Sequence, residues 1–216
     1  MDWLLALFAW SCLQPLNTLK INRVDLQISR PARRFAPTIP AGEGALGGGR
    51  FGAARMRFGY RASGQWLYVN ETFSRKLSRF AIGVDGSLGV KEDITEFGHG
   101  VFPDGLAFDV NGDAWVVSIV SNRVIQVSRD GSQTVFMQDA DPQHLDWVEA
   151  AYQANAMGRP HLDALRSSVL KNVSSLAFGG PHSRAGYLGC LLGDAVAQVD
   201  MPVPGHPPVH WHYPFT

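Results

Sequence analysis

A strand-and-turn pattern that recurs along the chain constrains its fold more than any other feature. In the first copy, an apolar strand over residues 64–69 leads through a polar turn to a second strand over 76–80 and a tight Asp-Gly turn over 84–87. Residues 104–131 repeat the same order of parts, and residues 176–199 hold a third copy. Repeats of roughly 40 to 50 residues with several strands in each unit are typical of β-propeller blades. The repeat therefore predicts an all-β fold.

The composition agrees with this fold and argues against a nucleic-acid partner. Glycine (23 residues) and proline (13 residues) are frequent, which indicates many turns between short strands. Hydrophobic residues make up 45% of the chain, enough for a packed core. The formal net charge is +0, so no basic surface is expected to attract nucleic acid.

One helix is predicted inside the blade pattern. The third copy is delayed by residues 139–170, where apolar residues such as Leu145 and Val148 recur at helical spacing behind Asp141 and a proline. These features predict an inserted helix near 142–157. Its apolar stripe is expected to pack over one end of the blades.

Residues 1–55 differ from the rest of the chain. They contain one alternating strand pattern within 18–29 and then a stretch rich in glycine and proline over 31–54, which is typical of a linker. We therefore expect a divergent N-terminal segment over 1–55 and propeller blades over 56–216. The apolar run at the N-terminus is too short to span a bilayer and lacks a basic leader, so we expect a cytoplasmic protein without membrane segments.

The most distinctive string of the chain lies at the start of the second copy. It reads Phe102-Pro103-Asp104-Gly105-Leu106-Ala107-Phe108-Asp109, followed by Asn111-Gly112-Asp113-Ala114-Trp115-Val116. This string resembles the signature of the senescence marker protein, gluconolactonase and luciferin-regenerating enzyme family. Residues 67–72 and 176–180 look like the preceding and following blade motifs of that family, so the resemblance covers about residues 56–213. The N-terminal part is truncated or divergent by comparison.

The resemblance implies a fold, an activity and a site residue. Members of the family are six-bladed propellers that use a divalent metal, commonly calcium, zinc or magnesium, to hydrolyse lactones and related esters. By resemblance, Asp104 is the carboxylate that binds the metal or takes a proton from the attacking water. The substrate would be a small lactone or another sugar-derived molecule, which Ser174 and Ser175 could hydrogen-bond. The alternatives are that Asp104 forms a turn before Gly105 and that the two serines cap a turn.

The metal site implied by the resemblance is incomplete in this sequence. An asparagine of the family falls at Met56, and a thioether is a poor ligand for a hard cation. The glutamate and second asparagine that the family also uses are not found in residues 1–55. The chain is therefore either a metal-dependent, lactonase-like hydrolase or a non-catalytic propeller remnant or binding module.

Chain length predicts a partial ring. Six blades need roughly 270 residues, whereas three to four fit in this chain of 216 residues. A partial ring exposes strand edges, so we expect self-association through the blade edges.

Histidines provide weaker candidates for chemistry. His99 stands between two glycines and lies either in a loop or in the channel near Asp104. The C-terminal histidines 206, 210 and 212 have spacing compatible with a metal site, but the prolines between them favour a solvated tail.

Overall fold

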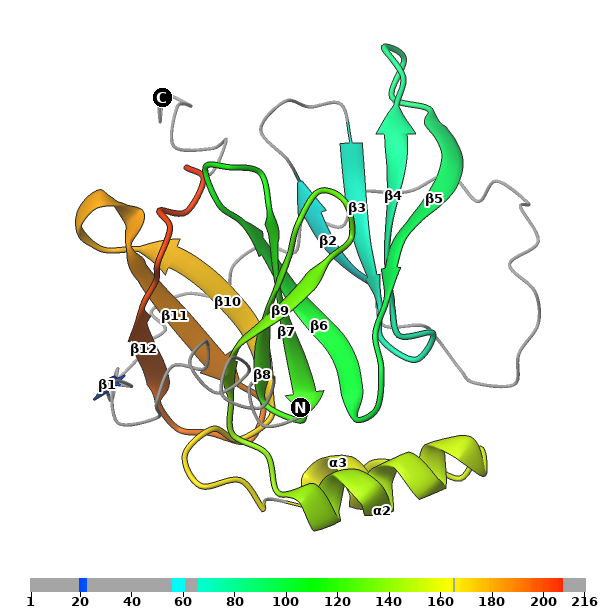
Figure 1. Cartoon of the computed structure of the whole chain (residues 1–216), viewed down its shortest axis with the longest axis vertical. Helices are drawn as coiled ribbons and strands as arrows, with labels where there is room; N and C mark the ends of the chain where they lie inside the picture. The colour runs from blue at the N-terminus through cyan, green and yellow to red at the C-terminus, as the bar shows by residue number, and fades with distance from the viewer. Residues whose placement is uncertain (1–19, 23–55, 61–65, 165, 208–216) are drawn as a thin grey trace, which may run out of the picture.

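The computed structural model describes residues 20–22, 56–60, 66–164 and 166–207. These residues form three four-stranded antiparallel sheets (Figure 1). The first sheet contains β2 (Met56–Tyr60), β3 (Trp66–Glu71), β4 (Lys76–Ile82) and β5 (Leu88–Glu96). The second contains β6 (Val101–Phe108), β7 (Ala114–Val120), β8 (Arg123–Val127) and β9 (Gln133–Gln138). The third contains β10 (Val173–Gly179), β11 (Ala185–Cys190), β12 (Val196–Asp200) and β1 (Lys20–Asn22).

The order of strands makes each sheet a propeller blade. Within each sheet the neighbouring strands follow one another along the chain, except that β1 supplies the outermost strand of the third sheet. The first strands of the three sheets lie next to one another, because β6 contacts both β2 and β10. The predicted all-β, partial propeller is confirmed. The boundary at residue 55 stays a prediction. In the third sheet, the short β1 pairs with β12, with Ile21 opposite Ala197.

Equivalent hairpin turns explain the repeat seen in the sequence. Asp85 accepts a hydrogen bond from the backbone N–H of Ser87 at 3.0 Å, and Asp130 accepts one from Ser132 at the same distance. The glycine after each aspartate adopts a positive φ, 81° at Gly86 and 87° at position 131. An L-residue with a side chain rarely adopts this conformation, so the Asp-Gly pair is required by the turn.

The core lies between the blades, and β7 lies at its centre. All seven residues of β7 are buried, because its two faces pack against different neighbours. Trp115 and Val117 belong to the cluster shared with the third blade, whereas Val116 belongs to the cluster shared with the first. A strand covered on both faces loses the alternation of polar and apolar residues. Stacking of blades therefore explains the continuous apolar run of this strand.

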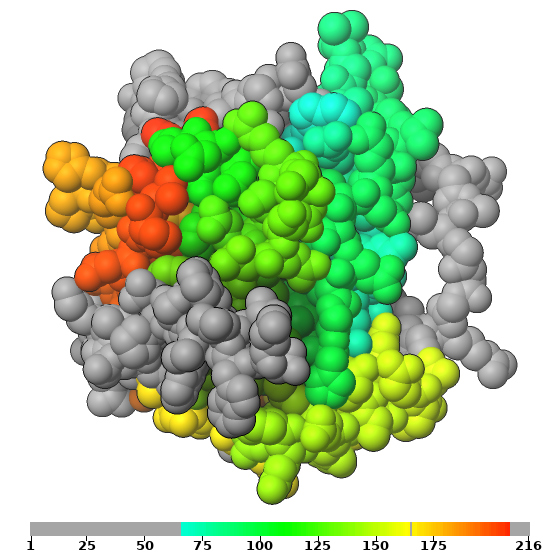
Figure 2. All heavy atoms as spheres, in the orientation of Figure 1, coloured from blue at the N-terminus to red at the C-terminus, as the bar shows by residue number. Residues whose placement is uncertain are grey.

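Two helices follow β9 and form what we call the helical cap, residues 142–163. The predicted helix is present as α2 (Pro142–Gln153), and a short second helix, α3 (Arg159–Asp163), follows it. A single turn of 3-10 helix, η2 (Pro181–Ser183), lies elsewhere, between β10 and β11. The Asp141 carboxylate caps α2 by accepting a hydrogen bond from the backbone N–H of His144 at 2.9 Å. The cap lies across the end of the propeller at which β6 begins (Figures 1 and 2). None of these helices has the length and apolar character needed to cross a bilayer.

Candidate functional site

Asp104 and Gly105 form a β-bulge in the inner strand of the second blade. Pro103 pairs with Ser118 and Leu106 pairs with Val116, so two residues of β6 lie opposite one residue of β7. A bulge interrupts the hydrogen-bond ladder and redirects a side chain, and bulges are frequent next to active sites. Asp104 therefore lies within a strand and not in a turn, which removes the turn-forming interpretation of this residue.

Asn70 of β3 binds the main chain of this bulge. Its Nδ2 atom donates hydrogen bonds to the carbonyl oxygens of Asp104 and Gly105, both at 3.1 Å. Asn70 is fully buried, and its Oδ1 atom accepts no hydrogen bond from the described residues. Buried carbonyl groups need donors, so this amide stabilises the irregular backbone and fixes the position of Asp104.

Gly105 allows the inner strands of the second and third blades to approach closely. A Cβ atom at this position would lie 2.7 Å from both Ser174 O and Ser175 Cα. The neighbouring strand β10 also has an irregular register at this point, between Val173 and Ser175. The glycine of the Asp-Gly pair is thus required by contact between strands.

Asp104 is the acidic residue of the inner strand β6 and is only 1% exposed. Buried carboxylates are rare in proteins unless they are paired, hydrogen-bonded or bound to metal. A carboxylate held on an inner blade strand, next to a buried amide, can act as a base or as an oxygen ligand. Asp104 therefore stays the candidate for a catalytic or metal-binding carboxylate.

The second half of the signature string has a structural role. Asp109 accepts hydrogen bonds from the backbone N–H groups of Asn111 and Asp113 at 2.9 and 3.0 Å. Its other oxygen accepts one from the Trp115 indole Nε1 at 2.9 Å. These bonds close the turn between β6 and β7 and orient a fully buried tryptophan. Asp109 is therefore a turn and packing residue, although it belongs to the same string as Asp104.

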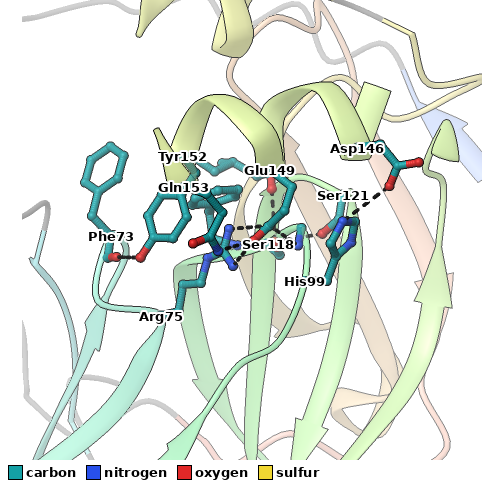
Figure 3. Close-up of polar contacts among 12 residues, drawn as sticks. Phe73, Arg75, His99, Ser118, Ser121, Asp146, Glu149, Tyr152 and Gln153 are labelled. Atoms are coloured by element: carbon teal, nitrogen blue, oxygen red, sulfur yellow. Dashed lines mark hydrogen bonds and ion pairs between the residues drawn. The ribbon is translucent and has the colours of Figure 1, made fainter. Parts of the chain in front are cut away.

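The described histidines and serines that the sequence suggested for chemistry differ in their exposure and contacts. His99 lies in an exposed loop with Nε2 at 3.3 Å from Asp146 Oδ1 on α2 (Figure 3). Ser174 is buried and its hydroxyl donates to Gly189 O at 3.4 Å, whereas Ser175 is exposed. His206 is half-buried with Nδ1 at 2.9 Å from Pro207 O, and histidines 210 and 212 lie outside the described residues.

Met56 is the first residue of β2, where it pairs with Glu71. Its side chain lies outside the described residues, so the match of Met56 to the family's asparagine stays a prediction. Among the residues with described side chains, no three His, Cys, Asp or Glu residues cluster as metal ligands would. The side-chain oxygen atoms at the bulge that lack a hydrogen-bond partner among the described residues are Asn70 Oδ1 and Asp104 Oδ2.

An ion pair that the sequence did not reveal attaches the helical cap to the blades (Figure 3). Arg75, in the turn between β3 and β4, donates to both carboxylate oxygens of Glu149 on α2, at 3.0 and 2.6 Å. The guanidinium also lies over the rings of Phe102 and Tyr152, at 4.4 and 3.9 Å. Hydrogen bonding from Arg75 lowers the pKa of the Glu149 carboxyl to about 2. The partners lie 74 positions apart, so no local pattern could have linked them.

The cap therefore covers the end of the propeller that is nearer to Asp104. Phe102 is fully buried and lies edge-on to Tyr152 of α2, with ring centroids 5.4 Å apart. Asp104 follows two residues later along β6, a distance of roughly 7 Å in a strand.

Comparison with known proteins agrees with the resemblance drawn from the sequence. Residues 58–138 match the model of the SMP-30/Gluconolactonase/LRE-like region. A 6-deoxy-6-sulfogluconolactonase of Pseudomonas putida is 37% identical over 68 residues, which are 31% of this chain and 23% of that protein.

Solved structures of similar fold include a luciferin-regenerating enzyme, with a TM-score of 0.48 and 17% identity over 70% of this chain and 47% of that one. A regucalcin from Agrobacterium tumefaciens, described as a calcium-binding protein, has a TM-score of 0.47 and 16% identity over 69% and 46% of the two chains. A gluconolactonase from Xanthomonas campestris has a TM-score of 0.45 and 16% identity over 71% and 39%. This chain spans less than half the length of each of these relatives.

Proposed function

We propose that the chain acts in the hydrolysis of a small lactone, with Asp104 as its catalytic carboxylate, because residues 58–138 match the model of the SMP-30/Gluconolactonase/LRE-like region. The observation that supports this role most is the placement of Asp104 in a bulge of an inner strand, where Asn70 holds the main chain. The sulfogluconolactonase relative supports a sugar-derived lactone as the substrate.

The chemistry requires one group that accepts a proton. Water attacks the lactone carbonyl carbon and transfers its proton to the Asp104 carboxylate, the ring C–O bond breaks, and the proton is then delivered to the ring oxygen that leaves. The product is a hydroxy acid. A positioned general base contributes about 10²- to 10⁴-fold to such a rate.

A divalent cation fits the chemistry of the two oxygen ligands at the bulge. Asp104 would hold it through the carboxylate and Asn70 through Oδ1, which has no hydrogen-bond partner among the described residues. Oxygen ligands suit calcium and magnesium better than zinc, which is more often bound by nitrogen and sulfur. When bound, the cation polarises the lactone carbonyl as a Lewis acid.

The rate of glucono-1,5-lactone hydrolysis, measured through the acid that the reaction releases, tests the proposal. We expect Asp104→Asn to lower kcat/KM by at least about 100-fold, because the amide cannot accept the proton. Asp130→Asn is the matched control, since Asp130 lies in an exposed hairpin turn, and it should stay within about twofold of the wild type. Equal rates for the wild type and Asp104→Asn would exclude Asp104 as the catalytic carboxylate.

Calorimetric titration with calcium and with magnesium tests the cation. We expect saturable binding by the wild type that Asp104→Asn abolishes, because the carboxylate carries the negative charge of the site. An absence of binding by both proteins, together with an absence of lactone hydrolysis, would favour the non-catalytic propeller module over the enzyme.

A further inference from the structure

The helical cap contains a buried histidine that no part of the proposed reaction uses. His144 is the third residue of α2 and is only 3% exposed. Its backbone N–H donates to the Asp141 carboxylate, but its ring atom Nδ1 has no hydrogen-bond partner among the residues that the structure describes. A buried imidazole with an unsatisfied nitrogen is stable only while it is neutral.

His144 lies in an aromatic cluster, made with Trp147 and His161, that joins the two helices of the cap. The ring centroids of His144 and Trp147 are 5.6 Å apart, and those of Trp147 and His161 are 4.4 Å apart with planes at 31°. His161 belongs to α3, which is also tied to the third blade by a hydrogen bond from Asn172 Nδ2 to Leu162 O. The cluster is therefore one part of the contact between α3 and the first half of α2, beside Leu162 of α3, which packs against the apolar cluster that includes Leu145.

The charges around His144 oppose its protonation. Burial lowers the pKa of the imidazole below its ordinary value of 6.5, and the nearby Arg166 and His161 lower it further, while Asp141 acts in the opposite sense. The N-terminus of a helix also disfavours a positive charge. Attraction of an imidazolium to the nearby Trp147 ring offsets only a small part of this cost.

We propose that the helical cap is an acid-sensitive cover, in which protonation of His144 separates α3 from the first half of α2 below neutral pH. This inference goes beyond the proposed lactone hydrolysis and does not depend on it. The second half of α2 stays docked, because the Arg75–Glu149 pair retains its charges at mild acidity. The chain after the cap also stays in place, since Asp139 accepts hydrogen bonds from three successive backbone N–H groups.

The pH window follows from the direction of the shift. The pKa of His144 is lowered while α3 is docked on α2. Neutral His144 therefore stabilises the docked state at pH values above the ordinary imidazole pKa of 6.5, and this stability is lost as the pH falls below 6.5. Another contact of α2 is the attraction between the side chains of Asp146 and His99. Both of these side chains are exposed, so this attraction contributes little.

Hydrogen exchange followed by mass spectrometry at pH 7.5 and pH 5.5 tests the cover on the intact chain. After correction for the intrinsic exchange rate, we expect peptides spanning residues 141–164 to open up to about tenfold more at pH 5.5. Peptides from β6 to β8 should not change. The cover is excluded if the cap peptides of the wild type show the same opening at both pH values.

Two variants and one direct measurement distinguish His144 from other groups. His144→Phe keeps a ring but cannot be charged, so its cap peptides should show no pH response, whereas His99→Gln should keep the response of the wild type. A response of equal size in His144→Phe would overturn the proposal.

The imidazole titration of His144 in the wild type can be followed by NMR, with His144→Gln used to assign the signal. We expect its midpoint below pH 6.5, and a midpoint at or above 6.5 would also overturn the proposal.

Discussion

Gly105 lies where the inner strands of the second and third blades leave no space for a side chain. Replacement by alanine would place a Cβ atom 2.7 Å from the backbone of β10, which cannot move as a flexible side chain would. We expect Gly105→Ala to lower the free energy of unfolding by about 2–3 kcal/mol, measured by urea denaturation.

Gly98→Ala is the matched control for this substitution. A Cβ atom at position 98 would meet no atom within 4 Å, and the residue has no positive φ. Its stability should stay within about 0.5 kcal/mol of the wild type. Equal losses of stability in the two variants would show that the contact between Gly105 and β10 does not limit the packing of the blades.

The sequence predicted part of this site at the scale of single residues. Asp104 was found because it belongs to a contiguous string whose order and spacing are specific. Asn70 was missed as its partner, because the carbonyl groups that it binds follow 34 and 35 positions later and the contact exists only when the blades stack. Asp109 could not be separated from Asp104 by sequence, since both are acidic residues of one string and only their hydrogen bonds distinguish them.

At the scale of elements, the Arg75–Glu149 pair attaches α2 to the first blade, together with a hydrogen bond from the Tyr152 hydroxyl to Phe73 O at 2.7 Å. The pKa of Glu149 falls from an ordinary 4.5 to about 2, so this pair stabilises the fold above pH 4.5 and loses that contribution as the pH falls towards 2. The shift corresponds to about 3 kcal/mol, at 1.36 kcal/mol for each pKa unit.

Urea denaturation as a function of pH checks this contribution. The wild type should be more stable than Glu149→Gln at pH 6, and the difference should shrink between pH 4.5 and 2 as the carboxylate is protonated. Glu96→Gln serves as a control, because the Glu96 side chain is exposed at the end of β5. A difference between the wild type and Glu149→Gln that did not vary with pH would contradict the role of the ion pair.

Elements were predictable where their patterns are local. The strands of the blades and the start of α2 at Pro142 follow from alternation, turn residues and the Asp141 cap. The short α3 was not predicted, because five residues that include a proline provide no apolar period. The attachment of the cap to the blades arises from Arg75 and Glu149, whose pairing requires the tertiary fold.

At the scale of the molecule, self-association through the blade edges stays a prediction. The outer strand β5 ends its sheet, and exposed Leu88 and Val90 lie in its first half. Charged residues over 91–93 occupy the middle of the strand, as is common at edges that avoid pairing with other chains.

Sedimentation velocity over a range of protein concentrations measures this association. We expect the average mass to rise with concentration, and Val90→Lys to weaken the association at least severalfold by adding charge to the apolar half of the edge. Thr134→Lys, on the exposed part of β9, is the control. A monomer at every concentration would show that the edge charges prevent pairing.

The pairing of β1 with β12 has a consequence for the order in which the chain folds. The first two sheets join neighbouring hairpins, so their contacts are local and can form while later residues are still being synthesised. The third sheet unites residues 20–22 with 196–198, and this closure must wait until residues 196–198 have left the ribosome. Closing so long a loop is slow, so the third blade should be the last to acquire its outer strand and the one most exposed to misassembly during synthesis.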